Sequence, residues 1–215
     1  MHEGVVALAK PIGITLVTAA QIQAALTAFT TVESAFNTAR STKQAASDAF
    51  HTAEAAVAAW LGVVRAVLTG HYGSRWSTLW AQAGFINHST AVPARIAERL
   101  ALAESVTGFL TLNPAMEVPN LNVTAAYGTT LRNTALTTQQ AVMTATVSLG
   151  TIGQTWTTAY DTLISVMRDL ISNLGRKLSG DDPRWLAFGL QMPATVTTPG
   201  KPQNLNASFD ELGES

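Results

Sequence analysis

Residues 15–69 contain one glycine, Gly62, and no proline, so nothing in this stretch is a strong helix breaker. Apolar side chains recur along it every three or four positions. This spacing is typical of a helix that buries one face. The residues concerned are Ile22, Leu26, Phe29, Phe36, Phe50, Val57, Leu61, Val64 and Leu68.

The apolar spacing weakens over residues 39–49, where Arg40 and Lys43 fall on the seam. One interpretation is a continuous long helix. The other is a hairpin in which Ser41 and Gln44 form a capping box for a second helix. The lack of glycine and proline favours the continuous helix, with Gly70 as the residue that follows its end.

A second long helix is predicted over residues 122–179. Its later half carries the apolar series Leu149, Ile152, Trp156, Tyr160, Leu163, Met167, Leu170 and Leu174. Gly150 and Gly153 indicate a bend, or a place where another helix approaches closely. Gly180 is expected to follow the end of this helix. Asp182 and Pro183 then suit the start of a short helical turn.

Shorter elements are predicted between and after the two long helices. Residues 74–83 suit a short helix, and another helix runs from near Pro93 to Asn113. The predicted fold is an all-α, elongated bundle over residues 1–192, with two long helices and two or three shorter ones. The two apolar series are expected to pack against each other. A Pro-rich linker over residues 193–215 follows.

The tetrapeptide VTAA occurs at Val17 and again at Val123. After each copy come a long helical segment, a glycine and an Arg-Trp pair, Arg75-Trp76 or Arg184-Trp185. An internal duplication explains this order. So do two helices of equal length that lie side by side.

Composition excludes several classes of protein. Charged residues make up 13% of the chain and the net charge is −1, which gives no support for nucleic acid binding. Cysteine is absent, which excludes disulfides and thiol chemistry and leaves the compartment open. The uncharged spans 11–32 and 133–160 are too polar to predict a transmembrane helix. A sparsely charged surface favours self-association.

The C-terminal stretch "PGKPQNLNA" resembles the opening of a fibronectin type III module. Either residues 193–215 hold a linker and the first strand of a truncated module, or this tail is disordered. The stretches "GSRWSTLWAQAGF", "NPAMEVPNLNVTAA" and "DDPRWLAFGLQMPA" resemble uncharacterised bacterial proteins in which an Ala-rich helical region precedes such a module. This resemblance implies a multidomain protein that is secreted or on the cell surface, although no signal peptide is visible.

The candidate site residues are aromatic and basic. Arg75, Trp76, Trp80, Arg184 and Trp185 either close the ends of the bundle or form a partner-binding patch. No catalytic, cofactor or metal motif is recognised, because His2, His51, His71 and His88 lack ligand spacing. Asp181 and Asp182 are interpreted as helix-capping residues, and Glu117 as a solvated or capping carboxylate.

The sequence predicts a non-enzymatic structural or interaction domain, a spacer or assembly unit of a multidomain bacterial protein. A protein partner or self-association is expected, without nucleic acid, membrane, small-molecule ligand, metal or cofactor. One alternative is a membrane-active or pore-forming component. The other is an enzyme with a site at the Trp-rich end, near His71, His88 and Asp181.

Overall fold

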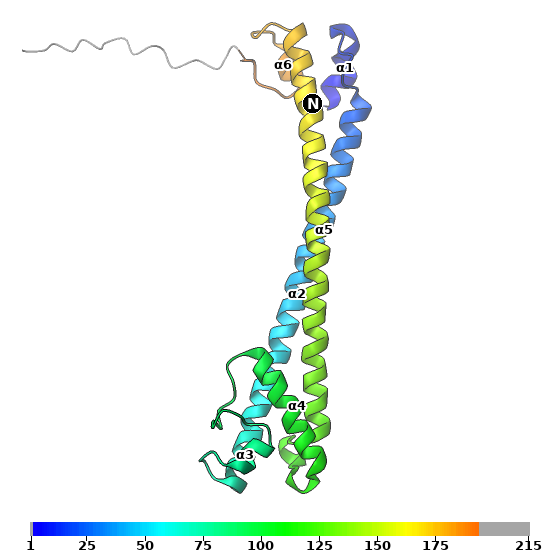
Figure 1. The fold of residues 1–215 in the computed structure, drawn as a ribbon. Coiled ribbons are helices and arrows are strands. Elements are labelled where there is room, and N and C mark those ends of the chain that lie inside the picture. The colour runs from blue at the N-terminus through cyan, green and yellow to red at the C-terminus, as the bar shows by residue number, and fades with distance from the viewer. Residues whose placement is uncertain (1, 194–215) are drawn as a thin grey trace, which may run out of the picture. The chain divides into compact units, whose positions relative to one another are not determined.

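The computed structural model describes residues 2–193, without the side chains of His2 and Ala9 (Figure 1). These residues form helices and no strand, which confirms the predicted all-α fold with two long helices and several shorter ones. The predicted linker and fibronectin-like strand lie outside the described residues, apart from residue 193. The elements are α1 (His2–Ile12), α2 (Ala19–Tyr72), α3 (Thr78–Gln82), α4 (Ile96–Leu112), η1 (Pro114–Met116), η2 (Pro119–Leu121), α5 (Ala125–Lys177) and α6 (Arg184–Ala187).

The chain predicted as one domain over residues 1–192 divides into two compact units. Unit 1 comprises residues 2–33 and 155–193, and unit 2 comprises residues 34–154. Both α2 and α5 continue from one unit into the other without a break in the helix.

The continuous helix, and not the hairpin, is the conformation of residues 19–72. The side chains proposed for a capping box are used inside the helix instead. The Ser41 hydroxyl donates to the carbonyl of Asn37 at 3.2 Å, and the Gln44 amide donates to the Asp48 carboxylate at 2.8 Å. Both bonds span four residues, the spacing that brings side chains together on one helix face.

The VTAA repeat marks the start of each long helix. The Thr18 hydroxyl accepts from the N–H of Gln21 at 3.2 Å, and Gln21 Oε1 accepts from the N–H of Thr18 at 2.8 Å, a reciprocal capping box. At the second copy, the Thr124 hydroxyl accepts from the N–H of Tyr127 at 3.2 Å. The valine before each threonine is buried, at 4% for Val17 and 1% for Val123. The repeat is therefore a helix N-cap preceded by a buried anchor.

The predicted helix ends are wrong by a few residues. Gly70 lies inside α2, which continues to Tyr72, and Gly73 follows with a φ of +79°. That left-handed conformation costs glycine little, so the helix ends there and not at Gly70. At the second long helix, Gly180 lies three positions beyond Lys177, the last residue of α5.

After each long helix, a short helix places a tryptophan against the C-terminal end of that long helix. Trp80 of α3 donates its indole N–H to the carbonyl of Gly73 at 3.1 Å, and Trp185 of α6 donates to that of Ser179 at 2.9 Å. A buried phenylalanine follows in each case, Phe85 or Phe188. The structural counterpart of Trp185 is therefore Trp80, whereas the sequence pattern paired it with Trp76.

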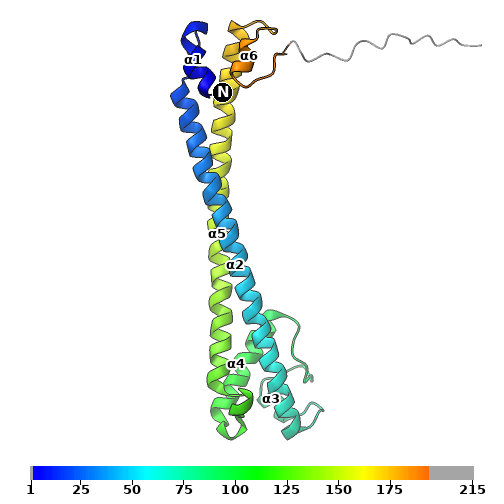
Figure 2. The same ribbon diagram turned by 180° about the vertical axis from the view of Figure 1, so that it is seen from behind.

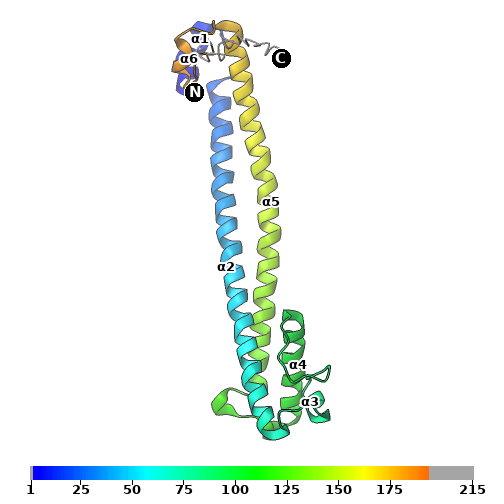
Figure 3. The ribbon, with the colours of Figure 1, turned by 90° about the vertical axis from the view of Figure 1, so that its left-hand side faces the viewer.

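Unit 2 is built around α4, which packs against parts of α2 and α5 (Figures 2 and 3). The α2 residues Val57, Leu61, Val64 and Leu68 are at most 1% exposed. Their partners in the same core are Leu100, Leu102, Ala103, Val106, Phe109 and Leu110 of α4, with Val123 and Ala135. The later part of the first apolar series is thus buried mainly by α4, not by the Leu149–Leu174 series as predicted.

Unit 1 has its own core. Leu170 and Leu174 of α5 are fully buried there with Ile22 of α2, together with Val5, Ile14, Val17, Leu178, Trp185 and Phe188. A β-carbon on Gly4 would lie 2.5 Å from the carbonyl oxygen of Ala187, so glycine permits the close approach of α1 and α6. Nearby, Trp156 and Tyr160 stack at 5.4 Å between ring centroids, and Phe29 of α2 lies 5.8 Å from Trp156.

Ion pairs join the helices of unit 2. Arg99 of α4 pairs with Glu54 of α2, and both side chains are about four-fifths buried, at 17% and 21% exposed. Arg132 of α5 pairs with Glu104 of α4 at 2.7 Å. Burial of the first pair leaves little solvent to screen it, so loss of either partner would leave a costly unpaired charge.

One helix of the described part, α2, is long and apolar enough to cross a membrane, with a mean hydropathy of 1.4 over its best 18-residue window. A helix in the core of a globular protein meets the same criterion, and 33% of that window is buried. The criterion is weak evidence for a span, and the sequence-based expectation of no transmembrane helix stays a prediction.

The capping assignment makes a quantitative prediction. Thr18→Ala removes the hydroxyl that accepts from Gln21, and we expect the free energy of unfolding to fall by about 1 kcal/mol. Thr31→Ala is the matched control, because Thr31 lies within α2 and its hydroxyl donates to the carbonyl of Thr27. Alanine is the better helix former there, so the control should be neutral or slightly stabilising. Urea unfolding followed by circular dichroism measures both, and equal losses would contradict the assignment.

Candidate functional site

A cleft of about 500 Å³ lies in unit 2 between the chain that follows α3 and the first half of α4. Clefts of 300–1,000 Å³ are the usual size for small-ligand sites. One wall is the segment 84–94, and the other is the α4 face that carries Glu98, Ala101, Leu102 and Ser105. These four residues are spaced three and four apart, so they share one side of the helix.

The rim of the cleft is a strained turn. Asn87 and His88 both have left-handed backbones, with φ of 60° and 53°, and the N–H of Ser89 donates to the carbonyl of Ile86 at 3.3 Å. Two central residues with positive φ make a type I′ turn. In the left-handed region the β-carbon of either residue lies close to the following carbonyl. Asparagine tolerates this better than histidine, because its short polar side chain can hydrogen-bond locally.

A tilted contact between two rings holds His88 in place. The imidazole of His88 lies 4.2 Å from the ring of Trp76, measured between centroids. The indole N–H of Trp76 donates to the carbonyl of Phe85 at 3.1 Å. The turn is therefore fastened at Phe85 before it and at His88 within it.

A second contact that positions the segment 84–94 is the close approach of Gly84 to α4. A β-carbon on Gly84 would lie 2.3 Å from the β-carbon of Ser105, and its φ of +94° also favours glycine. The floor of the cleft is therefore rigid. Phe85, next to Gly84, is 2% exposed and meets Trp80 edge-on at 4.9 Å.

The lining is largely apolar and carries one carboxylate. Phe85, Ile86, Val92, Pro93 and Leu102 supply the apolar part. Glu98 also lies 3.9 Å from the guanidinium of Arg95 in a largely exposed pair. The hydroxyl of Ser89 accepts from the N–H of Ala91 at 3.1 Å. Such a lining suits an apolar group that enters between the turn and α4.

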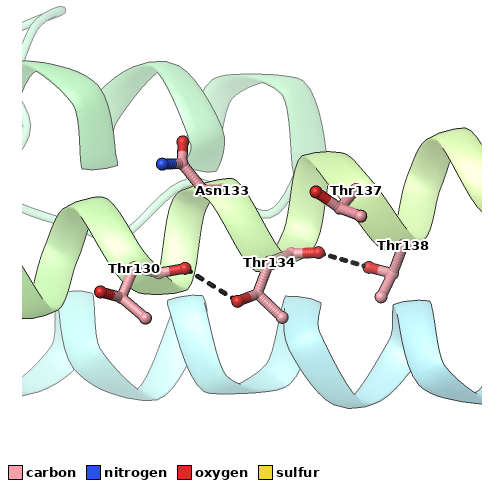
Figure 4. A pocket seen from close by; sticks show the side chains of 5 residues that line it. All are labelled: Thr130, Asn133, Thr134, Thr137 and Thr138. Atoms are coloured by element: carbon pink, nitrogen blue, oxygen red, sulfur yellow. Dashed lines mark hydrogen bonds between the residues drawn. The ribbon is translucent and has the colours of Figure 1, made fainter.

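A second hollow, of about 390 Å³, lies on α5 and is lined by threonine and asparagine (Figure 4). The hydroxyls of Thr134 and Thr138 donate to the carbonyls of Thr130 and Thr134, each at 2.9 Å. These donors are already used within the helix. The hollow is therefore a weaker candidate than the cleft.

The five residues predicted as a partner-binding patch are distributed over both units. Arg75, Trp76 and Trp80 lie in unit 2, and Arg184 and Trp185 lie in unit 1. Trp80 and Trp185 are 0% and 3% exposed, so their rings form cores and not a surface. Trp76 is half-buried and helps to shape the cleft rim. The alternative interpretation, in which the tryptophans close the cores and Arg184 pairs with a carboxylate, agrees with the structure.

The three carboxylates that the sequence analysis named accept hydrogen bonds from residues nearby in the chain. Glu117 accepts from the N–H of Ala125 at 2.7 Å and so caps α5. A hydrogen bond from the Ser179 hydroxyl lowers the pKa of Asp181, and the hydrogen bond from Arg184 lowers that of Asp182. Both groups therefore stay ionised at neutral pH. Asp182 also accepts from the N–H of Arg184 at 2.9 Å, as expected of a residue that starts α6.

The residues of the enzyme alternative are also divided between units, with His71 and His88 in unit 2 and Asp181 in unit 1. The ring of His71 lies 6.5 Å from that of Tyr72. Within residues 2–193, no three His, Asp or Glu side chains are grouped as a metal site would require.

Sequence reasoning missed the cleft, although the segment "GFINHSTAVP" carries a signal for it. Glycine and asparagine in that segment mark a turn, but the α4 wall became apparent only from the fold. Comparisons with models of known families, with curated proteins and with solved structures find no match.

The strained rim makes a prediction. His88→Ala loses the ring contact with Trp76 but keeps a β-carbon in the left-handed region, whereas His88→Gly loses the ring contact and also the strain. We expect the glycine variant to be the more stable of the two by about 1 kcal/mol. Urea unfolding measures the difference. His71→Ala, on the exposed face of α2, should change stability little, and an alanine variant at 88 as stable as the glycine variant would show that the turn is unstrained.

The paired carboxylate predicts a dependence on pH. The pKa of Asp182 is lowered in the folded chain, so its pairing stabilises α6 above the ordinary value of 3.8 and is lost as the pH falls through the lower, folded value. Trp185 lies in α6, so its fluorescence should report loosening of unit 1 in acid. Asp182→Ala should show that loosened signal already at neutral pH. An acid transition unchanged by the substitution would contradict this assignment.

Proposed function

We propose that this chain is a non-enzymatic structural and interaction module that binds a protein partner by accepting an apolar side chain in the unit 2 cleft. The observation that carries the proposal is the rigid apolar cleft, whose rim turn is held in a strained conformation by Trp76 and His88. Backbone strain of this kind costs stability and occurs often at binding sites.

The rim itself favours a protein over a small molecule. Ile86 lines the cleft and is 68% exposed. Its side chain therefore adds apolar surface at the opening to the apolar lining of the cleft itself. A protein partner can cover Ile86 while one of its own side chains fills the cleft. Central apolar anchors in a pocket are the usual source of affinity in such interfaces.

The remaining features support a structural role. Two continuous helices connect the units, and each helix start is capped by the chain's own side chains. The charged residues Arg99, Glu54, Arg132 and Glu104 join helices to one another. The resemblance to helical regions that precede fibronectin type III modules supports a place in a multidomain bacterial protein.

A substitution that fills the cleft tests the proposal. Ala101 is exposed and lines the cleft, so Ala101→Trp should occupy it without disturbing the core. Peptides selected from a random displayed library on the unmodified chain should share one aliphatic or aromatic anchor. Their affinity should fall at least about tenfold for Ala101→Trp, the factor expected when one buried apolar anchor is lost.

The matched control is Ala97→Trp, one turn earlier on α4, where the residue is exposed and does not line the cleft. It adds the same indole and should leave affinity unchanged. Nile red provides a second readout, because its fluorescence should rise on entering the cleft of the unmodified chain and of Ala97→Trp only. Peptides or dye that bind Ala101→Trp equally well would refute the proposal.

A further inference from the structure

The first turn of α4 supplies the charge of the cleft. Glu98 lies on the α4 face that also presents Ala101 and Leu102 to the cleft, and none of the described lining residues is a lysine or an arginine. The Glu98 side chain is 55% exposed, so a molecule that enters the cleft can reach its carboxylate. The cleft therefore offers a negative charge next to an apolar interior.

Two arginines near this turn leave the carboxylate of Glu98 without a close cation. The guanidinium of Arg95 lies 3.9 Å away, which is beyond hydrogen-bond distance, and its side chain is 85% exposed. Arg99 is engaged elsewhere, because it donates to the carboxylate of Glu54 and to the carbonyl of Ala94. Within residues 2–193, no side chain or N–H donates a hydrogen bond to the Glu98 carboxylate.

Glu98 differs in this respect from the two glutamates that join helices in unit 2. Glu54 pairs with Arg99, and Glu104 pairs with Arg132 at 2.7 Å. An acidic residue in the first turn of a helix is favoured by the helix dipole, which accounts for Glu98 at this position. That local role leaves both carboxylate oxygens able to accept from a cation outside the chain.

We propose that the protein segment that fills the cleft carries a lysine or arginine two positions from its apolar anchor, and that this cation pairs with Glu98. The inference rests on the proposed function and adds the chemistry of the partner. Glu98 precedes Leu102 by four residues, so their β-carbons lie about 5–6 Å apart. Side chains two positions apart on an extended segment point the same way and lie about 6–7 Å apart, which matches that spacing.

The charge of the cleft also selects against other occupants. An acidic segment would place like charges together, which suppresses binding. A small hydrophobic amine would satisfy Glu98 but would leave Ile86, which is 68% exposed, in water. A protein segment covers Ile86 and supplies both the anchor and the cation.

Peptides selected from a random displayed library on the unmodified chain give the first test. Besides the shared apolar anchor, they should be enriched in lysine or arginine two positions from it. For such a peptide, Glu98→Gln should lower affinity about fivefold at low salt, the upper range for an exposed ion pair. The loss should disappear in about 1 M salt, because screening then acts within about 3 Å.

A double-mutant cycle separates the pairing from other effects of the substitution. A peptide whose cation is replaced by glutamine should bind the unmodified chain about fivefold more weakly, with no further loss on Glu98→Gln. Asp48→Asn is the matched control, because it removes one negative charge from an exposed position of α2 in unit 2, outside the cleft. The asparagine oxygen still accepts from Gln44, and affinity for both peptides should stay unchanged.

Removal of the weak competing cation gives a change of opposite sign. Arg95 does not line the cleft, so Arg95→Gln takes away the distant guanidinium and leaves the lining intact. Affinity for the basic peptide should rise by up to about twofold, and affinity for the glutamine peptide should not. Circular dichroism confirms that each variant folds.

Several results would overturn the inference and leave the proposed function in place. These are selected peptides that share an anchor but no basic residue, equal losses for the two peptides on Glu98→Gln, and the same loss on Asp48→Asn. Phenethylamine that binds as tightly as the peptides would identify a small amine as the occupant instead. An unmodified chain that selects no peptide would refute the proposed function, and the inference with it.

Discussion

An indole N–H that leaves water must find an acceptor, and this requirement organises both units. Trp60, Trp76, Trp80 and Trp185 each donate to a backbone carbonyl in a loop or just beyond a helix end. Such carbonyls lack helical partners of their own. Each bond therefore satisfies two groups at once and fixes a connection against a core that the aromatic ring helps to fill.

Two connections of unit 2 follow from this arrangement. Trp76 fixes the segment that begins the cleft wall, because its acceptor is Phe85. Trp60 fixes the connection between α4 and α5, because its acceptor is Asn122. Two loops that carry exposed apolar side chains, Ile86 in one and Leu121 in the other, are thereby held in defined conformations. Rigid presentation of this kind lowers the entropy lost on binding.

The helices were predictable because their signals are local. The spacing around Val57 to Leu68 and the absence of proline predicted α2, and its continuity through Ser41 followed from the same signals. The helix ends were less predictable, since Gly70 and Gly73 carry the same sequence signal and only the chain's return to Trp80 selects Gly73. The cleft was missed because its walls, Phe85 and Leu102, are brought together by Gly84 meeting Ser105.

The partners of the apolar faces were predictable only in part, since Ile22 meets Leu170 and Leu174 as expected. Two regular series predicted one seam between α2 and α5, yet Val57 to Leu68 pack mainly on α4, and Leu170 and Leu174 pack with α1, α6 and the start of α2. Periodicity states that a face is buried but carries no information on what buries it. Likewise the sequence left open whether Trp80 and Trp185 close the bundle or form a partner-binding patch, and both are core residues.

The sequence by itself determined that the chain is helical, where the two long helices start, and that few of its residues are charged. These properties depend on residues within one or two helical turns of each other. Only the tertiary structure decided which faces meet, which tryptophans are buried, and which segments form the walls of the cleft. Those outcomes depend on contacts such as Trp60 with Gly128, between residues that are distant in the chain and that no local pattern relates.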